Sequence, residues 1–154
     1  MARNNLLKAL EKGLEKAMDV RERIFDERLK GHCCSETIMS MCLADLGRDG
    51  ADTDRANADL VRAMGAFCGG LGEGLACGTL CAAVGVLHVA CEDPRTARGE
   101  LQPVMMRWFF DRFGSCNCAE LLDGDETRKL THCPVFVEET YLKLREMLED
   151  IGVL

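Results

Sequence analysis

The sequence predicts an all-α protein, a single cysteine-rich domain spanning residues 1–154 that folds as a bundle of about five or six helices around a central apolar helix. Three observations support this prediction. Apolar residues recur every three to four positions in several charged segments, which is typical of amphipathic helices. Residues 75–91 contain no charged side chain, and no segment alternates as a strand does. A chain of 154 residues can also bury a substantial core without disulfide staples.

Three helices are expected before the central one. The first covers residues 5–29 and ends at Gly31. The second starts near Ser35, a good N-cap, and ends near Gly47. After a polar turn at residues 48–51, a third helix continues to Gly69 and Gly70. The N-cap of this third helix is Asp52 or Thr53. The apolar residues that define the first helix are Leu7, Leu10, Leu14, Ala17 and Met18. Those that define the third are Leu60, Val61, Met64 and Phe67.

Residues 75–91 are expected to form the buried central helix. The segment is shorter than the roughly 20 apolar residues that a membrane helix needs, and it includes His88. Gly78 and Gly85 lie seven positions apart, hence on one side of the helix, where a neighbouring helix can approach closely. We therefore expect a helix wrapped by the others and no membrane insertion.

Two further helices are expected in the C-terminal part. Residues 104–113 contain an aromatic group that suits the core. A loop with Cys116 and Cys118 follows, and Cys133 with Pro134 opens the final helix. This helix can pack on the first helix or pair with a second chain, so a homodimer is one expectation. Its apolar positions are Val137, Tyr141, Leu144, Leu148 and Ile151.

Composition limits the classes of function. The net charge of -7 and the lack of a Lys/Arg block disfavour nucleic acid or an anionic membrane as the partner. The first residues carry charges among their leucines and lack the apolar stretch of a signal peptide, so a cytoplasmic protein is expected. In a reducing compartment, ten cysteines indicate metal binding, catalysis or redox sensing, although some can be small buried hydrophobes.

Cys77 is the strongest candidate for a reactive thiol. It follows the glycine-rich segment FCGGLGEG and should lie in the first turn of the central helix, where free N–H groups favour a thiolate. Cys81, one turn further, can share a metal with it, whereas Cys91 lies about 21 Å away along the helix. A dinucleotide loop is disfavoured because no strand precedes these glycines.

The other cysteines fall into three groups. Cys34 and Cys133 also sit at expected helix N-termini and share the thiolate argument. The Cys33–Cys34 and Cys116–Cys118 pairs do not easily form disulfides internally, so a metal or a distant cysteine is a simpler partner. His32 and His132 each precede a cysteine and can assist it or be ordinary loop residues, whereas His88 is expected to be a core histidine.

With these residues singled out, the sequence resembles the redox-active protein family named for its C_GCAxxG_C_C cysteine pattern. The matching segments are residues 31–36 around Cys34, residues 69–80 around Cys77, residues 113–122 around Cys118, and Cys133 before the last helix. Thr79 stands where the family usually has alanine, and several cysteines are additional. The resemblance implies a role near oxidoreductases or transporters and a bound group such as an iron–sulfur cluster.

Three functional hypotheses follow. In the first, Cys34, Cys77, Cys118 and Cys133 converge, either as ligands of an iron–sulfur cluster or another soft metal, or as dithiols that exchange disulfides with an oxidoreductase partner. Cys77 and Cys34 are then the redox-active thiols, and Cys33, Cys81 and Cys116 are additional candidate ligands. The second hypothesis is a non-catalytic module that binds or senses zinc or another soft metal. The third is an interaction protein without thiol chemistry.

Overall fold

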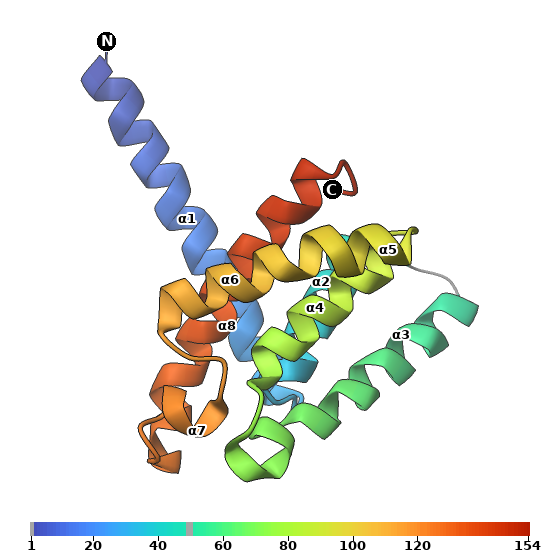
Figure 1. Ribbon diagram of the computed structural model, residues 1–154. Coiled ribbons are helices and arrows are strands. Elements are labelled where there is room, and N and C mark those ends of the chain that lie inside the picture. The colour runs from blue at the N-terminus through green and yellow to red at the C-terminus, as the bar shows by residue number, and fades with distance from the viewer. Residues whose placement is uncertain (1, 49–50) are drawn as a thin grey trace.

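Helices form most of the chain that the computed structural model describes, residues 2–48 and 51–154 (Figure 1). The predicted all-α class is confirmed: within these ranges there is no strand, and one isolated bridge joins Ala76 to Asn117. Six of the helices have twelve residues or more, close to the predicted number. They are α1 (Ala2–Leu29), α2 (Cys34–Asp45), α3 (Ala51–Met64), α4 (Gly78–Ala90), α6 (Gln102–Phe113) and α8 (Lys129–Asp150).

The central position of the apolar helix is confirmed. Helix α4 packs against α2, α3, α6 and α8, and most of its side chains are buried. Its glycines allow the close approach that the sequence indicates: a Cβ on Gly78 would lie 2.6 Å from the Phe67 carbonyl oxygen, and one on Gly85 would lie 3.3 Å from Met39 Cε. The helix begins at Gly78 and not at residue 75, because residues 75–77 are held in a bridge to the loop before α7.

Shorter helical segments connect the long ones. They are η1 (Gly65–Phe67), η2 (Gly70–Gly74), α5 (Pro94–Thr96), η3 (Ala97–Leu101), α7 (Cys118–Leu121) and η4 (Glu126–Arg128). α5, η3 and α6 run on continuously from residue 94 to residue 113, so this helix starts ten residues before the expected position. The reason is local: the Asp93 carboxylate accepts from the Arg95 N–H at 3.0 Å, and Pro94 suits a first helical turn.

The final helix packs on the first, one of the two alternatives expected for it. Val20 and Ile24 of α1 are buried in the core together with residues of α8. Beyond this contact α1 projects away from the other helices, as the blue ribbon of Figure 1 shows. Leu7, Leu10 and Leu14 are 50–65% exposed on that projecting part.

A buried polar group joins three helices. The Tyr141 hydroxyl of α8 donates to the carboxylate of Asp45 in α2 and accepts from the guanidinium of Arg23 in α1. Arg23 Nη2 also lies 2.9 Å from Asp45 Oδ1. Burial, with the Asp45 hydrogen bond, raises the pKa of Tyr141 to about 12. Tyr141 is therefore a neutral donor that fixes the position of α8.

Some expectations fall on residues outside the description. Asp49 and Gly50 of the expected turn are among them, and α3 begins beside them at Ala51. The side chains of Ala17, Met18 and the proposed caps Asp52 and Thr53 are also outside it. Among the described residues, no helix combines the length and the apolar character needed to cross a lipid bilayer.

Candidate functional site

Three of the four predicted site cysteines lie at the beginnings of helices. Cys34 is the first residue of α2, Cys77 is the N-cap of α4, and Cys118 is the first residue of α7. A helix N-terminus offers free N–H groups and a positive dipole end, both of which favour a thiolate. The positions of Cys34 and Cys77 agree with the sequence analysis. The helix start at Cys118 was not predicted.

Cys133 differs from its predicted position. Helix α8 begins four residues earlier, at Lys129, because the Asp125 carboxylate accepts from the Thr127 N–H at 2.9 Å and starts a helical turn that runs into α8. Cys133 and Pro134 therefore lie in the second turn of the helix. The prediction that they open the final helix is wrong, and so is the argument that a helix N-terminus favours a Cys133 thiolate.

A pair of extended segments brings Cys77 next to the Cys116–Cys118 loop. The Cys77 N–H donates to the Cys116 carbonyl oxygen at 2.8 Å, and the Cys118 N–H donates to the Leu75 carbonyl oxygen at 2.7 Å. These two hydrogen bonds flank the Ala76–Asn117 bridge. Segments about forty residues apart in the sequence are thus held together by their backbones, whatever their side chains bind.

Glycines make this close approach possible. Gly70 has φ +63°, and a Cβ there would lie 2.5 Å from the Leu75 nitrogen and 2.8 Å from Cys118 Cβ. Gly74 has φ +72°, and its Cβ would lie 2.7 Å from Ala119 Cβ. Both the left-handed backbone and the lack of space favour glycine. The glycine-rich segment before α4 therefore packs against the first residues of α7.

Cys34 is the electrostatic centre of a group of thiols, which we call the Cys34 thiol cluster. When Cys34 is ionised, its charge adds to the effect of burial in raising the pKa of each of the other four members. Such an effect requires proximity, because charges interact strongly only at short range. No three of these sulfurs lie within 4.8 Å of one another, so one metal ion shared by several of them would require their side chains to move closer. The cluster comprises Cys34, Cys77, Cys81, Cys118 and Cys133, and Cys116 adjoins it through its effect on Cys81.

Burial makes several thiols of the cluster harder to ionise. Burial raises the pKa of Cys77 to about 12 and that of Cys133 to about 11, and it also raises that of Cys118. The expected low pKa of Cys77 is therefore wrong for the free thiol. Its position at a helix start is as predicted, but Cys77 is only 5% exposed, and the cost of burying a charge exceeds the benefit of the helix end.

Donors nevertheless surround the Cys77 sulfur. The backbone N–H groups of Thr79 and Leu80 and the Thr79 hydroxyl all act to lower its pKa, as groups that donate to a thiolate do. Among the described residues, the buried Thr79 hydroxyl has no hydrogen-bond partner. A charged Cys77 sulfur would supply that partner. This surrounding fits a sulfur that carries negative charge, as it does when it binds a metal.

Two cations border the cluster. Lys129 Nζ lies 2.9 Å from Glu126 Oε2, and its charge lowers the pKa of Cys118 and Cys133. Arg28 also lowers that of Cys133. These charges only partly offset burial, because the pKa values of both thiols remain raised.

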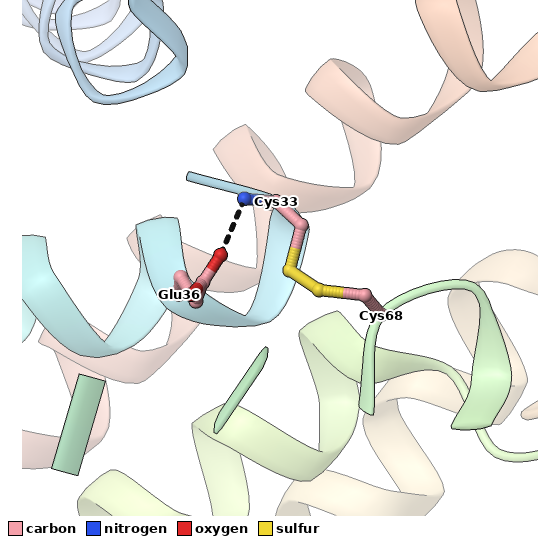
Figure 2. Close-up of side chains that lie close together, drawn as sticks. All are labelled: Cys33, Glu36 and Cys68. Carbon is pink, nitrogen blue, oxygen red and sulfur yellow. Dashed lines mark hydrogen bonds between the residues drawn. A yellow bond between two sulfur atoms is a disulfide. The ribbon is translucent and has the colours of Figure 1, made fainter. Parts of the chain in front are cut away.

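Cys33 and Cys68 form a disulfide beside this cluster (Figure 2). The Cys33 sulfur is therefore not a metal ligand in this state, contrary to one of the predicted additional roles. A distant cysteine was one of the two partners expected for it, but the choice of Cys68 was not. Glu36 Oε2 accepts from the Cys33 N–H at 2.9 Å. The three side chains form the one group among the described residues in which three ligand atoms lie within 4.8 Å of one another.

The remaining cysteines and histidines have plainer surroundings. Cys42 is 1% exposed in the core, and Cys91 lies after the last residue of α4. His88 Nε2 lies 3.1 Å from the Gln102 side-chain oxygen, so the hydrogen bond expected of a core histidine is present, but His88 is only partly buried. His32 Nδ1 lies 2.6 Å from a Glu27 carboxylate oxygen. His132 lies beside the Thr131 hydroxyl, at 2.9 Å.

Comparison with known families agrees with these cysteine positions. A family model described as "Putative redox-active protein (C_GCAxxG_C_C)" matches residues 32–147, three quarters of the chain. The chain belongs to this family. The match begins just before Cys34 and extends past Cys133, so it spans all four cysteines of the C_GCAxxG_C_C pattern. No curated protein and no solved structure matches the chain.

Proposed function

We propose that this C_GCAxxG_C_C protein is a redox component whose Cys34, Cys77, Cys118 and Cys133 hold an iron–sulfur cluster or another soft metal ion. The observation that carries the proposal is the backbone pairing that holds Cys77 beside the segment of Cys118, with Cys34 near enough for its charge to act on Cys77, Cys118 and Cys133. Four sulfurs in one part of the fold, two of them buried, cannot all be thiolates unless a cation compensates their mutual repulsion. Thiolates are the ligands that iron–sulfur clusters and zinc prefer.

The chain's own residues would prepare the site in three ways. The α2 and α7 helix starts and the α4 N-cap provide N–H groups for charged sulfurs. The Thr79 hydroxyl, which has no other partner among the described residues, would donate to a charged Cys77 sulfur, and Lys129 reduces the negative charge near Cys118. Burial excludes water from Cys77 and Cys118, which are 5% and 8% exposed. An iron–sulfur cluster, when bound, supplies one-electron transfer.

Cys77, Cys118 and Cys133 are poor candidates for disulfide exchange by themselves. The thiolate is the nucleophile in exchange, and the raised pKa values of these three leave little thiolate near neutral pH. All four site cysteines are free thiols, with Cys77 and Cys133 protonated up to a pH of about 12 and 11. These thiols suit metal binding better than disulfide exchange, because a bound cation offsets the cost of their ionisation. The partner in this proposal is a cytoplasmic oxidoreductase or a transporter-associated protein, and a homodimer remains part of it.

Anaerobic purification, a visible spectrum and metal analysis test the proposal. Iron with sulfide and a broad absorption near 400 nm is the expected result. Zinc without colour would favour the non-catalytic metal-binding module, and a metal-free protein after reconstitution would refute both. Serine at Cys34, Cys77, Cys118 or Cys133 should abolish or strongly weaken binding. The matched control is Cys42→Ser, because Cys42 is equally buried but the charges that act on it are Asp45, Arg23 and Arg145.

A further inference from the structure

The Cys33–Cys68 disulfide is a second sulfur site, made of cysteines outside the four-cysteine pattern of the family. Cys33 is the N-cap of α2, and Cys68 ends the short η1 helix before the glycine-rich loop. Both cysteines are partly exposed, in contrast to Cys77 and Cys118. The disulfide is thus partly exposed, next to a thiol cluster in which Cys77 and Cys118 are buried.

We infer that Cys33 and Cys68 are a redox-active pair that accepts two electrons from a protein dithiol. The inference goes beyond the metal centre proposed above and does not depend on it. Its support is the pairing of two partly exposed cysteines, the helix start at Cys33, and the polar groups held beside the two sulfurs.

Stability gives no evident reason for the disulfide. A disulfide mainly stabilises small folds whose core is too limited, whereas this chain buries apolar side chains from α1, α2, α4, α6 and α8 in one cluster. Cys33 and Cys68 belong neither to this hydrophobic core nor to the partly buried residues packed against it. A bond that the fold does not require can be opened without unfolding the protein.

The surroundings distinguish the two sulfurs. The Ser35 hydroxyl lies 3.2 Å from Cys33 Sγ and 3.8 Å from Cys68 Sγ, and it donates to the Met64 carbonyl oxygen at 2.8 Å. When the pair is reduced, the Cys33 thiol can donate a hydrogen bond to the Ser35 hydroxyl oxygen. The Ser35 hydroxyl can accept it because its own hydrogen is donated to the Met64 carbonyl oxygen. The helix start also favours a departing Cys33 thiolate. Cys33 is therefore the better leaving group, and Cys68 is the sulfur attacked.

The exchange balances in two steps. A thiolate of the partner dithiol attacks Cys68 Sγ, the bond between Cys33 and Cys68 breaks, and Cys33 leaves as a thiolate that takes a proton from water. The second thiol of the partner, after losing its proton to water, attacks the mixed disulfide, and Cys68 leaves and is protonated. Two electrons pass to the pair. The partner ends as a disulfide, and Cys33 and Cys68 end as thiols.

Glu36 gives this site a charge that can be changed without losing the helix cap. Its carboxylate lies within 4.8 Å of the sulfurs and accepts from the Cys33 N–H. Glutamine can accept the same hydrogen bond. Two unit charges 4.8 Å apart in water change a rate by about fourfold, so Glu36→Gln should speed thiolate attack by about that factor.

The experiment uses the full chain and reduced thioredoxin as the protein dithiol. Thiols are alkylated before and after reduction, and tandem mass spectrometry locates the labelled cysteines. We expect Cys33 and Cys68 to be protected at first, to become alkylated together under native conditions, and to be protected again after oxidised thioredoxin is added. Cys42→Ser, which changes a core cysteine outside both sulfur sites, should leave this cycle unchanged.

Three results would overturn the inference. The first is a pair that thioredoxin reduces only in denaturant, which would make it a structural disulfide. The second is a pair that is already free in the oxidised protein, or that binds zinc through Cys33, Cys68 and Glu36. The third is an attack rate that Glu36→Gln leaves unchanged or lowers. Cys33→Ser should abolish the exchange while preserving metal at the Cys34 thiol cluster, so the two proposals can fail separately.

Discussion

Metal binding to the Cys34 thiol cluster should depend steeply on pH. Cys77, Cys118 and Cys133 all have raised pKa values and are protonated at neutral pH, so each must lose its proton to become a ligand. A rise in the pKa of Cys77 from 9.0 to about 12 makes the loss of its proton about 4 kcal/mol harder. Three protons released per metal correspond to an apparent affinity that rises about a thousandfold per pH unit below these pKa values.

Competition with a chelator measures this dependence. The apparent affinity of the reduced protein for zinc would be determined between about pH 6 and pH 8, with the proton release followed in weak buffer. The logarithm of the affinity should rise with a slope of about three or more against pH. Cys77→Ser should lower the slope by about one. Cys42→Ser should leave it unchanged, although burial also raises the pKa of Cys42, because Cys42 lies outside the cluster.

A slope of one or less would refute the reasoning. So would a Cys77→Ser protein with the affinity and slope of the unmodified chain. Either result would mean that the thiols of the cluster do not share one cation, and the proposed function would lose its main support.

Three further predictions concern single side chains. Gly70→Ala should destabilise the protein in urea unfolding by about 2 kcal/mol more than Gly72→Ala: both have positive φ, but only at Gly70 does a Cβ meet other atoms, and equal losses would contradict this. Thr79→Val should weaken metal binding about tenfold and leave the stability of the metal-free protein unchanged or slightly higher. The reason is that the Thr79 hydroxyl has no partner among the described residues until Cys77 is charged. A large loss of metal-free stability would argue against this role. Tyr141→Phe should cost about 1–3 kcal/mol in urea unfolding, because it leaves the partly buried Asp45 carboxylate with one hydrogen-bond donor fewer. A neutral effect would show that this group does not fix α8.

The sequence was sufficient to predict the fold class because the relevant signals are local. Residues 75–91 are apolar on all sides, and that pattern has one good solution in water, a helix at the centre of a bundle. Helix boundaries were less predictable. The start of α8 depends on the Asp125 cap, and the end of the extended segment before Gly78 depends on a bridge to Asn117, forty-one residues later.

The site shows the same division between local and distant causes. That Cys34 and Cys77 lie at helix starts follows from nearby residues, and the structure has them there. The pKa of Cys77 depends on burial by other elements, which spacing along one helix does not reveal. The partner of Cys33 could not be chosen for the same reason. Phe67 lies against Gly78 and places η1 beside the start of α2, and neither contact has a sequence signature.

One peptide bond separates Cys33 of the disulfide from Cys34 at the centre of the thiol cluster. Any effect that occupancy of the proposed metal site has on the redox state of the pair must be reciprocal. If a metal binds the oxidised chain ten times more tightly than the reduced chain, the same metal makes the disulfide ten times harder to reduce. In such a protein, metal binding changes how readily a thiol partner reduces the disulfide, and reduction by that partner changes the affinity for the metal. Both effects act through a single turn of α2.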